Sequence, residues 1–322
     1  MRQTMRAAVI DEPGEPGIFR MTELAVPDRV SAEFLVKVVA AGVNPIDAKT
    51  RAGRGVFDSI RQFPSVLGQD FSGVVVQSPY DAHPIKPGDE VFGMVMVPRF
   101  GGSYSEYVTV PSISVVRKPS TLSHIEAAAA PVAALTAWGM VVEVAKAHEG
   151  QRMLIHAGSG GVGHFAVQFA SYFGAYVIAT SSQRNLGWLR ELGASEVIDY
   201  ANTRFEDAVS DVDVVIDLIG NVHDETGTRS LQVLRHGGLI VNVPTGSWPT
   251  FAEEAAAAGV RGTGFKVAPD GHSLAVISRL LESSAVRVHV ERIFELDQVA
   301  DAHRLLELGH TRGKLVLKVA EG

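Results

Sequence analysis

Three glycines, Gly158, Gly160 and Gly163, are the residues with the clearest chemical meaning, because they fit the pattern G-x-G-x-x-G. An apolar run at 152–157 precedes them, a helical pattern follows, and a second apolar run lies at 176–182. In this context the glycines permit a tight turn, a close approach of pyrophosphate to the backbone, and packing of helix on strand. The helix N-terminus adds unpaired N–H groups and partial positive charge. The loop residues expected to bind a dinucleotide are Gly158, Ser159, Gly160, Gly161, Val162 and Gly163.

The end of the second apolar run predicts which dinucleotide binds. An NAD site usually has Asp or Glu at this position to accept from the ribose 2′-hydroxyl. Here the chain reads Thr180, Ser181, Ser182, Gln183 and Arg184, without an acid. Hydroxyl and guanidinium groups suit a 2′-phosphate, so we expect NADPH to be bound by Ser181, Ser182 and Arg184. The alternative for Arg184 is a solvated charge at a helix start.

Composition limits the class of protein. A chain of 322 residues favours two domains, and 46% hydrophobic with 20% charged residues is typical of a folded globular protein. The formal charge of −7 and the lack of any basic run argue against a nucleic-acid partner. The chain has no cysteine, which excludes disulfides, cysteine nucleophiles and thiolate zinc sites.

No segment has the pattern of a membrane anchor. The N-terminal apolar run stops at Ile10, which is short for a signal peptide. The longest nearly uncharged run, 127–142, contains Pro131 and is shorter than a bilayer requires. We therefore expect a cytoplasmic protein without a membrane partner.

The pattern of elements predicts an α/β fold. The first third of the chain has Val-, Phe- and Tyr-rich runs separated by turn residues, which are typical of strands. Ser123, three residues before Glu126, marks a helix start, and apolar runs then alternate with helical segments. This alternation predicts a parallel sheet covered on both faces. The last run, 314–319, has no following helix, and we expect it to return to the N-terminal β region. We place a β-rich domain at 1–122 and 284–322, and a dinucleotide-binding domain at 123–283.

Seven motifs extend this interpretation over nearly the whole chain. Together they resemble the medium-chain dehydrogenase/reductase superfamily, and within it the zinc-free quinone oxidoreductase branch that includes zeta-crystallin and enone reductases. The resemblance implies a Rossmann doubly wound parallel sheet, a GroES-like catalytic domain, an active-site cleft between them, and a homodimer. The motifs are AGVNPIDAKTRAG (41–53), FPSVLGQDFSGVVV (63–76), KPGDEVFGM (86–94), GGSYSEYV (101–108), AAAAPVAALTAW (127–138), LIHAGSGGVGHFAVQFA (154–170) and HTRGKLVL (310–317).

The resemblance also bears on metal chemistry. Zinc-dependent relatives have a cysteine where this chain has Asn44, and Gly-His-Glu where it has Gly68, Gln69 and Asp70. Catalytic zinc needs about three ligands from His, Cys or carboxylate, so we expect no metal. Without a Lewis acid to stabilise an alkoxide, reduction of a quinone or of an activated C=C bond is favoured, because the substrate itself delocalises the added electrons.

The same resemblance implies three catalytic candidates. Asn44 and Asp47 are expected near the nicotinamide, where Asn44 would orient substrate or cofactor ribose and Asp47 would hold the loop. The alternative is an Asn-Pro turn with an aspartate cap. Lys49 matches the N-P-x-D-x-K pattern of enone-reducing relatives and could donate to a developing enolate. Its alternatives are binding of the cofactor ribose and a position in solvent.

Further cofactor positions follow from the resemblance. Thr136 is expected at the nicotinamide amide, with a bond to its own helix as the alternative. Tyr200 would lie near the 2′-phosphate. The remaining positions are Val243, Pro244 and Thr245 at a strand end, and Arg312 and Lys314 in the returning segment, where either could be a surface charge. Pocket walls or ordinary core residues are expected at Phe57, Phe100, Phe265 and Trp248, and packing roles at Tyr104 and Tyr107.

These residues predict a reductase of small molecules. A hydride would pass from NADPH to an electrophilic carbon of a quinone or an α,β-unsaturated carbonyl, followed by protonation from solvent or a nearby donor. An enoyl reductase acting on a thioester or biosynthetic intermediate is the alternative enzyme. A catalytically idle NADPH-binding regulatory protein is the alternative of another class. A short-chain dehydrogenase is disfavoured because its glycine spacing differs and no suitable Tyr-x-x-x-Lys follows the loop.

Overall fold

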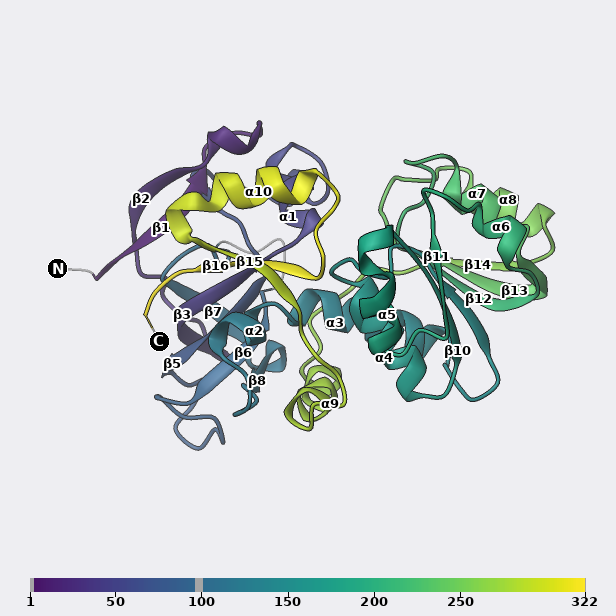
Figure 1. Ribbon diagram of the computed structural model, residues 1–322. Coiled ribbons are helices and arrows are strands. Elements are labelled where there is room, and N and C mark those ends of the chain that lie inside the picture. Colours follow the sequence, from purple (N-terminus) through teal and green to yellow (C-terminus); the bar gives the residue numbers. More distant parts are fainter. Residues whose placement is uncertain (1–2, 96–100, 322) are drawn as a thin grey trace. The chain divides into compact units, whose positions relative to one another are not determined.

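The computed structural model describes residues 3–95 and 101–321, and its chain divides into two units (Figure 1). The first unit comprises Met1–Leu135 and Ala268–Gly322, and the second comprises Thr136–Val267. Phe100, one of the candidate pocket residues, lies outside the described residues.

The first unit is built on two sheets. The smaller has the order β2-β1-β4, and the larger has the order β15-β16-β3-β5-β6-β8, with β7 also paired to β3. The last strand pairs antiparallel with β3, Leu315 opposite Val43, so the chain end returns to the N-terminal β region as expected. The strands are β1 (Thr4–Ile10), β2 (Arg20–Ala25), β3 (Glu33–Val43), β4 (Ser65–Val66), β5 (Asp70–Gln77), β6 (Glu90–Met94), β7 (Tyr107–Pro111), β8 (Val115–Arg117), β15 (Val290–Glu295) and β16 (Lys314–Lys318).

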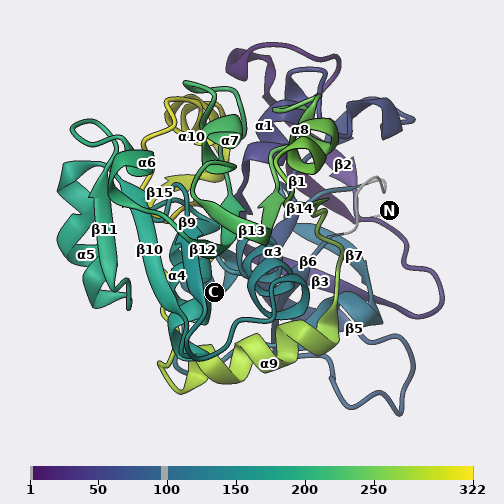
Figure 2. The same cartoon turned by 90° about the vertical axis from the view of Figure 1, so that its right-hand side faces the viewer.

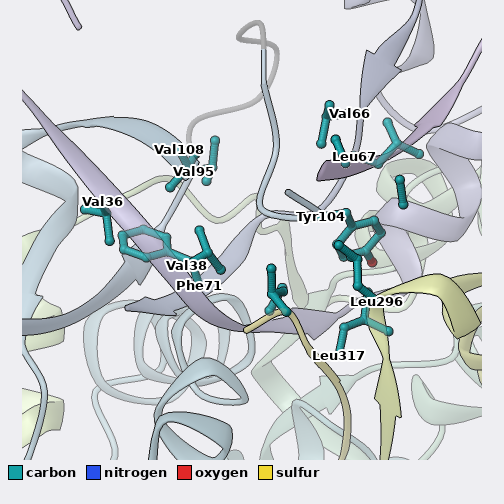
Figure 3. Packing of buried hydrophobic residues seen from close by; sticks show 14 of the residues in the cluster. Val36, Val38, Val66, Leu67, Phe71, Val95, Tyr104, Val108, Leu296 and Leu317 are labelled. Carbon is teal, nitrogen blue, oxygen red and sulfur yellow. The ribbon is translucent and has the colours of Figure 1, made fainter. Parts of the chain in front are cut away.

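Apolar side chains of these sheets form one buried cluster that includes Val36, Val38, Phe71, Tyr104 and Leu317 (Figure 3). Strand β3 is buried at almost every position, because elements cover both of its faces. Helix α10 packs against α1 and β16 (Figure 1). The helices of this unit are η1 (Pro16–Ile18), α1 (Pro45–Arg51), η2 (Phe57–Ser59), η3 (Ser112–Ser114), α2 (His124–Ala128), α9 (Gly271–Glu282), η6 (Leu296–Gln298) and α10 (Val299–Glu307), and α3 (Pro131–Trp138) begins in it.

The second unit has one six-stranded sheet in the order β11-β10-β9-β12-β13-β14, in which every pair is parallel (Figure 2). The chain order reverses between β9 and β12, and open sheets of this kind bind ligands outside the carboxyl ends of the strands at such a reversal. The strands are β9 (Arg152–Ile155), β10 (Tyr176–Ser181), β11 (Glu196–Asp199), β12 (Val212–Asp217), β13 (Leu234–Asn242) and β14 (Arg261–Gly264). The helices are η4 (Gly139–Val144), α4 (Gly163–Tyr172), η5 (Gln183–Asn185), α5 (Leu186–Glu191), α6 (Phe205–Ala208), α7 (Thr226–Ser230) and α8 (Phe251–Ala257).

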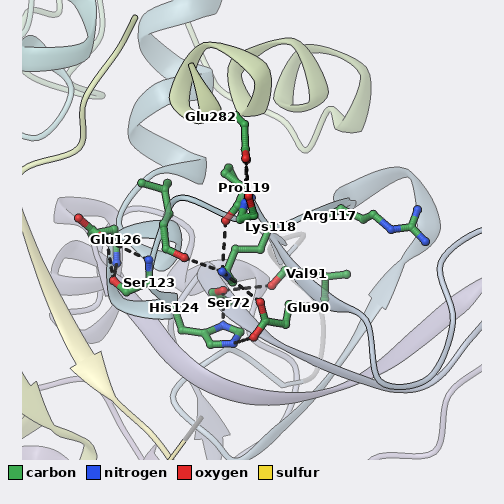
Figure 4. A network of polar contacts seen from close by, with 12 residues as sticks. Ser72, Glu90, Val91, Arg117, Lys118, Pro119, Ser123, His124, Glu126 and Glu282 are labelled. Carbon is green, nitrogen blue, oxygen red and sulfur yellow. Dashed lines mark hydrogen bonds and ion pairs between the residues drawn. The ribbon is translucent and has the colours of Figure 1, made fainter. Parts of the chain in front are cut away.

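The two units do not divide at the domain limits predicted from the sequence, which were residues 122 and 284. The segments 123–135 and 268–283 belong to the first unit. Polar contacts explain the difference (Figure 4). His124, the first residue of α2, has Nδ1 2.7 Å from Ser72 Oγ of β5 and Nε2 3.2 Å from Glu90 Oε1 of β6. Glu282 at the end of α9 accepts from Ser120 N and Oγ at 2.7 and 2.5 Å. These contacts tie α2 to β5 and β6, and α9 to the loop that follows β8, which helix periodicity does not indicate.

Candidate active site

The glycine loop joins the end of β9 to the start of α4. A Cβ on Gly163 would lie 2.1 Å from Ala157 O, and one on Gly158 would lie 3.0 Å from Ala179 Cβ. These two glycines are required by close packing inside the unit. A Cβ on Gly160 would meet only Ala157 O, at 3.3 Å, so its outer side is open. The loop therefore leaves room for a phosphate at Gly160, next to the N-terminus of a ten-residue helix.

Side chains from the end of β10 hold this loop in place. Ser181 Oγ donates to Ser159 Oγ at 2.8 Å, and Asn185 Nδ2 donates to the same oxygen at 3.0 Å. Asn185 also donates to Ser182 Oγ at 3.3 Å. Asn185 is not among the residues predicted from the sequence, although an amide just beyond a strand end is a signal for such a contact. The predicted phosphate loop and the predicted 2′-phosphate edge are thus joined by hydrogen bonds.

Tyr200 lies at the same edge. Its strand β11 runs parallel to β10 with Asp199 opposite Ser181, and Tyr200 N donates to Ser181 O at 3.2 Å. The Tyr200 side chain is 55% exposed, so its hydroxyl group is accessible to a ligand. The Asp199 carboxylate accepts from Asn202 Nδ2 at 2.6 Å and Ala201 N at 3.2 Å, and so caps its own turn.

The ends of the neighbouring strands form the rest of this edge. Asn242 Nδ2 donates to Asp217 Oδ2 at 2.7 Å, and Val243 N donates to Asp217 O at 3.1 Å, so β12 and β13 end together. Pro244 and Thr245 follow on this edge. Asp217 is not among the residues predicted from the sequence, because an acidic residue at the end of an apolar run belongs to no recognisable motif.

His156, at the end of β9, was also missed. Its Nδ1 lies 3.1 Å from Thr180 Oγ1 and its Nε2 2.9 Å from Ser230 Oγ, which links β9, β10 and α7. Burial lowers the pKa of His156 to about 4, so the ring is neutral at pH 7 and holds the strands rather than titrating.

Two candidate pocket walls are packing residues of the second unit. A Cβ on Gly139 would lie 2.1 Å from the Phe265 ring, so that ring packs directly on η4. Trp248 is 5% exposed and donates from Nε1 to Glu254 at 3.0 Å. Phe57 belongs to the first unit and has its ring 6.2 Å from that of Phe63. Thr136 lies buried in α3.

In the first unit, Asn44 and Asp47 begin α1 where β3 ends. Asp47 Oδ2 accepts from Asn44 N at 2.9 Å, which is the aspartate cap that the Asn-Pro pattern allows. The same oxygen accepts from Tyr104 Oη at 3.3 Å. Burial, together with the nearby Asp70 charge, raises the pKa of Asp47 to about 7. Asp47 is thus able to take up or release a proton near neutral pH.

Lys314 joins this cluster from the last strand. The residue is 3% exposed, and its Nζ donates to Asn44 Oδ1, to Val43 O at 3.1 Å and to Asp70 Oδ2 at 3.3 Å. An ammonium group has three hydrogens, so these acceptors use all of them. The three hydrogens of Lys314 are thus engaged inside the unit, and its expected contact with the cofactor stays a prediction.

Gly313 brings Lys314 to this position. It has φ +64, and a Cβ there would lie 2.3 Å from His289 O, so only glycine fits the turn into β16. Its neighbour Arg312 is half-buried, and its backbone N donates to Glu291 Oε2 at 2.8 Å.

Lys49, the third catalytic candidate, stands apart from the cluster. Positions two apart on a helix point in different directions, so Lys49 does not share the face of Asp47. The side chain is half-buried, and burial, with the Arg54 charge, lowers the pKa of Lys49. Such a lysine releases its proton more readily than one in water.

The sequence matches two domain families and several complete relatives. Residues 30–120 match the alcohol dehydrogenase GroES-like domain, and 192–317 match a family described as zinc-binding dehydrogenase. A Danio rerio protein named NAD(P)H oxidoreductase RTN4IP1, mitochondrial, is 33% identical over 99% of this chain and 92% of its own. A Solanum lycopersicum 2-methylene-furan-3-one reductase is 36% identical over 97% of this chain and 79% of its own. The structure of a Coxiella burnetii quinone oxidoreductase is 38% identical, with a TM-score of 0.93 over 99% of this chain and all of that one.

The chain belongs to the quinone oxidoreductase branch of the medium-chain dehydrogenase/reductase superfamily. The expected fold, a Rossmann sheet with a GroES-like domain, is confirmed. Membership makes this protein an oxidoreductase that uses a nicotinamide cofactor. Within residues 3–95 and 101–321, no helix is both long and apolar enough to cross a membrane. The cytoplasmic location and the homodimer stay predictions.

A zinc ion is implied by one of the two family descriptions. The residues at the corresponding positions are Asn44, Gln69 and Asp70, which offer two amides and one carboxylate. The ammonium group of Lys314 is already bonded to Asn44 and Asp70. In the described part of the chain, no three His, Cys, Asp or Glu side chains are placed to hold a metal ion. The side chains of this protein at these positions therefore do not form a donor set that fits zinc.

Proposed function

We propose that this protein reduces quinones or the activated C=C bond of α,β-unsaturated carbonyls with NADPH. The observation that carries the proposal is the acid-free end of β10 beside the glycine loop, where Ser181 ends the strand and Ser182 and Arg184 follow it. Tyr200 follows β11, and the carboxylate of Asp199 at the end of that strand is engaged in its own turn. A phosphate needs donors there, and hydroxyl and guanidinium groups are donors. NADPH, when bound, supplies the hydride.

The chain's own residues would position the cofactor and manage the proton. Gly160 and the N-terminus of α4 offer N–H groups to the pyrophosphate, and the Ser159 contacts fix the loop. Thr136 and the segment 243–245 are proposed to bind the nicotinamide half, and Arg312 stays a further cofactor candidate. In the first unit, Asn44 would donate to a ligand oxygen and Lys49 to the developing enolate.

The substrate class is supported by the chemistry and names of relatives. The tomato relative is named for reduction of an enone, and the Coxiella burnetii structure for a quinone. Both substrates stabilise the added electrons without a metal ion, which agrees with the unsuitable donor set at Asn44, Gln69 and Asp70.

Steady-state kinetics test this proposal. Oxidation of NADPH and NADH is followed with 1,4-benzoquinone, an alkenal, a cyclic enone and an enoyl thioester, each against a control without substrate. We expect kcat/KM to be at least about tenfold higher with NADPH, since one charged hydrogen bond is worth about 1.5–3 kcal/mol. Equal values for the two cofactors contradict the cofactor assignment. Turnover only of the thioester favours an enoyl reductase, and tight NADPH binding without any turnover favours an idle binding protein.

A further inference from the structure

The strongest unexplained feature outside the cofactor loop is a buried cation in the first unit. Lys314 Nζ lies among Asn44 Oδ1, Val43 O and Asp70 Oδ2, and the side chain comes from a strand some 270 residues away in the sequence. A fully buried ammonium group is costly unless acceptors surround it. A buried ammonium group that donates to three acceptors of its own unit calls for a role within that unit.

The contacts of Asn44 determine the orientation of its side-chain amide. Its Oδ1 accepts from Lys314, and its Nδ2 donates to Asp70 Oδ2 at 2.9 Å. The flipped amide would bring two donors, Nδ2 and the ammonium group, against each other, and two acceptors, Oδ1 and the carboxylate. One orientation alone satisfies all partners. One Nδ2 hydrogen donates to Asp70, which leaves the second hydrogen for another acceptor.

Both carboxylate oxygens of Asp70 accept hydrogen bonds. Its Oδ1 accepts from Val132 N at 2.7 Å, while Oδ2 accepts from Asn44 and Lys314. The Asp70 carboxylate is fully buried, so it is a fixed acceptor. Without Lys314, Asn44 would keep its Asp70 contact and its place in the capping box of α1, and the Asp70 charge would lose its cation.

We propose that Lys314 is a positioning residue that supplies a covalently attached cation and orients Asn44 so that its free Nδ2 hydrogen is presented to an oxygen of the bound ligand. The cation is fixed at positions where zinc-dependent relatives have their metal ligands. The inference rests on the proposed function for the ligand, whereas the orientation itself is a property of the free protein. The oxygen belongs to the substrate carbonyl or to the cofactor ribose.

The orientation is tested without any turnover. The chain has five asparagines, so the side-chain amide of Asn44 can be assigned in ¹⁵N-asparagine-labelled protein with an Asn44→Asp reference. We expect its hydrogen exchange to accelerate at least about tenfold in Lys314→Met, because a buried contact that fixes the amide is lost. Lys318→Met is the matched control, because Lys318 lies on the same strand and pairs with the exposed Glu321. Unchanged exchange in Lys314→Met overturns the orientation role.

Kinetic measurements then distinguish two roles of Lys314, the positioning of Asn44 and the balancing of the Asp70 charge. The double variant Asp70→Asn with Lys314→Met removes both charges and provides a folded protein if the single variant fails to fold. We expect its kcat/KM to stay at least about tenfold below wild type, because misplaced groups lose rate steeply. Recovery of wild-type kcat/KM would mean that Lys314 only balances charge, and would overturn the proposal. Lys314→Arg, which keeps the cation, is expected to recover part of the rate.

Two further measurements identify the acceptor. A rise in the NADPH Kd of the double variant assigns the oxygen to the ribose, and a fall in kcat at unchanged NADPH Kd assigns it to the substrate. A double variant with neither change contradicts the proposal. If the wild-type protein reduces no quinone or enone, the proposed function fails, while the hydrogen-exchange result for Asn44 still decides the orientation role.

Discussion

The hydroxyl group of Tyr104 donates to Asp47 Oδ2 at 3.3 Å, inside the hydrophobic core of the first unit. The same hydroxyl lies 3.3 Å from His303 Nε2 on α10. Tyr104 thus combines the packing role expected from its sequence with a polar contact to a catalytic candidate. This contact, with Asn44 N, gives the buried carboxyl its donors.

Removing this hydroxyl should cost stability. In Tyr104→Phe, Asp47 loses one donor while the ring still fills the core, so we expect a loss of about 1–2 kcal/mol. Urea unfolding at pH 7 measures the change. Tyr107→Phe is the control, because its hydroxyl accepts an exposed hydrogen bond from Gln3 at 3.2 Å. Equal stability of Tyr104→Phe and wild type would show that the Asp47 contact contributes nothing.

The raised pKa of Asp47 predicts a pH dependence of stability. The folded pKa is about 7 and the ordinary value is 3.8, so the folded state binds the additional proton between these values. Stability from this group is complete below about pH 4 and falls as pH rises through 7, by up to about 4 kcal/mol. Asp47→Asn, which resembles the protonated group, should lose this decline between about pH 4 and 7 in denaturant titrations.

The contribution of His303 to stability changes with pH in the opposite direction to that of Asp47. The pH dependence of stability must therefore be compared between variants and wild type. Burial, with the Arg51 charge, lowers the pKa of His303 to about 3, and its contribution therefore increases with pH between about 3 and 6.5. Asp58→Asn, at an exposed position, is the control for Asp47→Asn. The assignment is wrong if both variants decline with pH as wild type does.

The glycine loop gives a matched pair of variants. In Gly163→Ala the new Cβ would meet Ala157 O at 2.1 Å, whereas in Gly160→Ala the nearest atom lies at 3.3 Å. We expect Gly163→Ala to lower Tm by several degrees, with a cost of about 1–3 kcal/mol. Gly160→Ala should keep Tm and weaken NADPH binding, because its methyl group occupies the side open to phosphate. Thermal melts and fluorescence titration with NADPH measure the two effects, and a Gly160→Ala protein with wild-type Kd would contradict the phosphate position.

Arg184 should set cofactor preference. We expect Arg184→Ala to raise the KM for NADPH by about 10–100-fold, the value of one charge-assisted hydrogen bond, and to leave the KM for NADH nearly unchanged. Arg190→Ala, an exposed arginine at the end of α5, is the matched control. A parallel rise for both cofactors would assign Arg184 to general binding and not to the 2′-phosphate.

Local patterns were sufficient for the nucleotide half of the protein. Gly158, Gly160 and Gly163 predicted the strand–loop–helix turn, because each glycine follows from a local backbone requirement. The Ser123 and Glu126 helix start is present, with Ser123 Oγ accepting from Glu126 N at 3.2 Å. The units divide at other residues than the predicted domain limits, because contacts between distant residues, such as Ser120 with Glu282, decide to which unit a helix belongs.

By itself the sequence determined the fold class, the glycine loop between strand and helix, the acid-free strand end and the unsuitable zinc positions. The loop and the strand end depend on residues within a few positions of one another, and the zinc positions on residue types that are missing. The fold class follows from the order of such local patterns along the chain. Only the tertiary structure decided that Lys314 bonds Asn44 and Asp70, and that Asp47 is buried against Tyr104. These contacts join strands and helices far apart in the chain, and their energetics depend on burial, which no local pattern records.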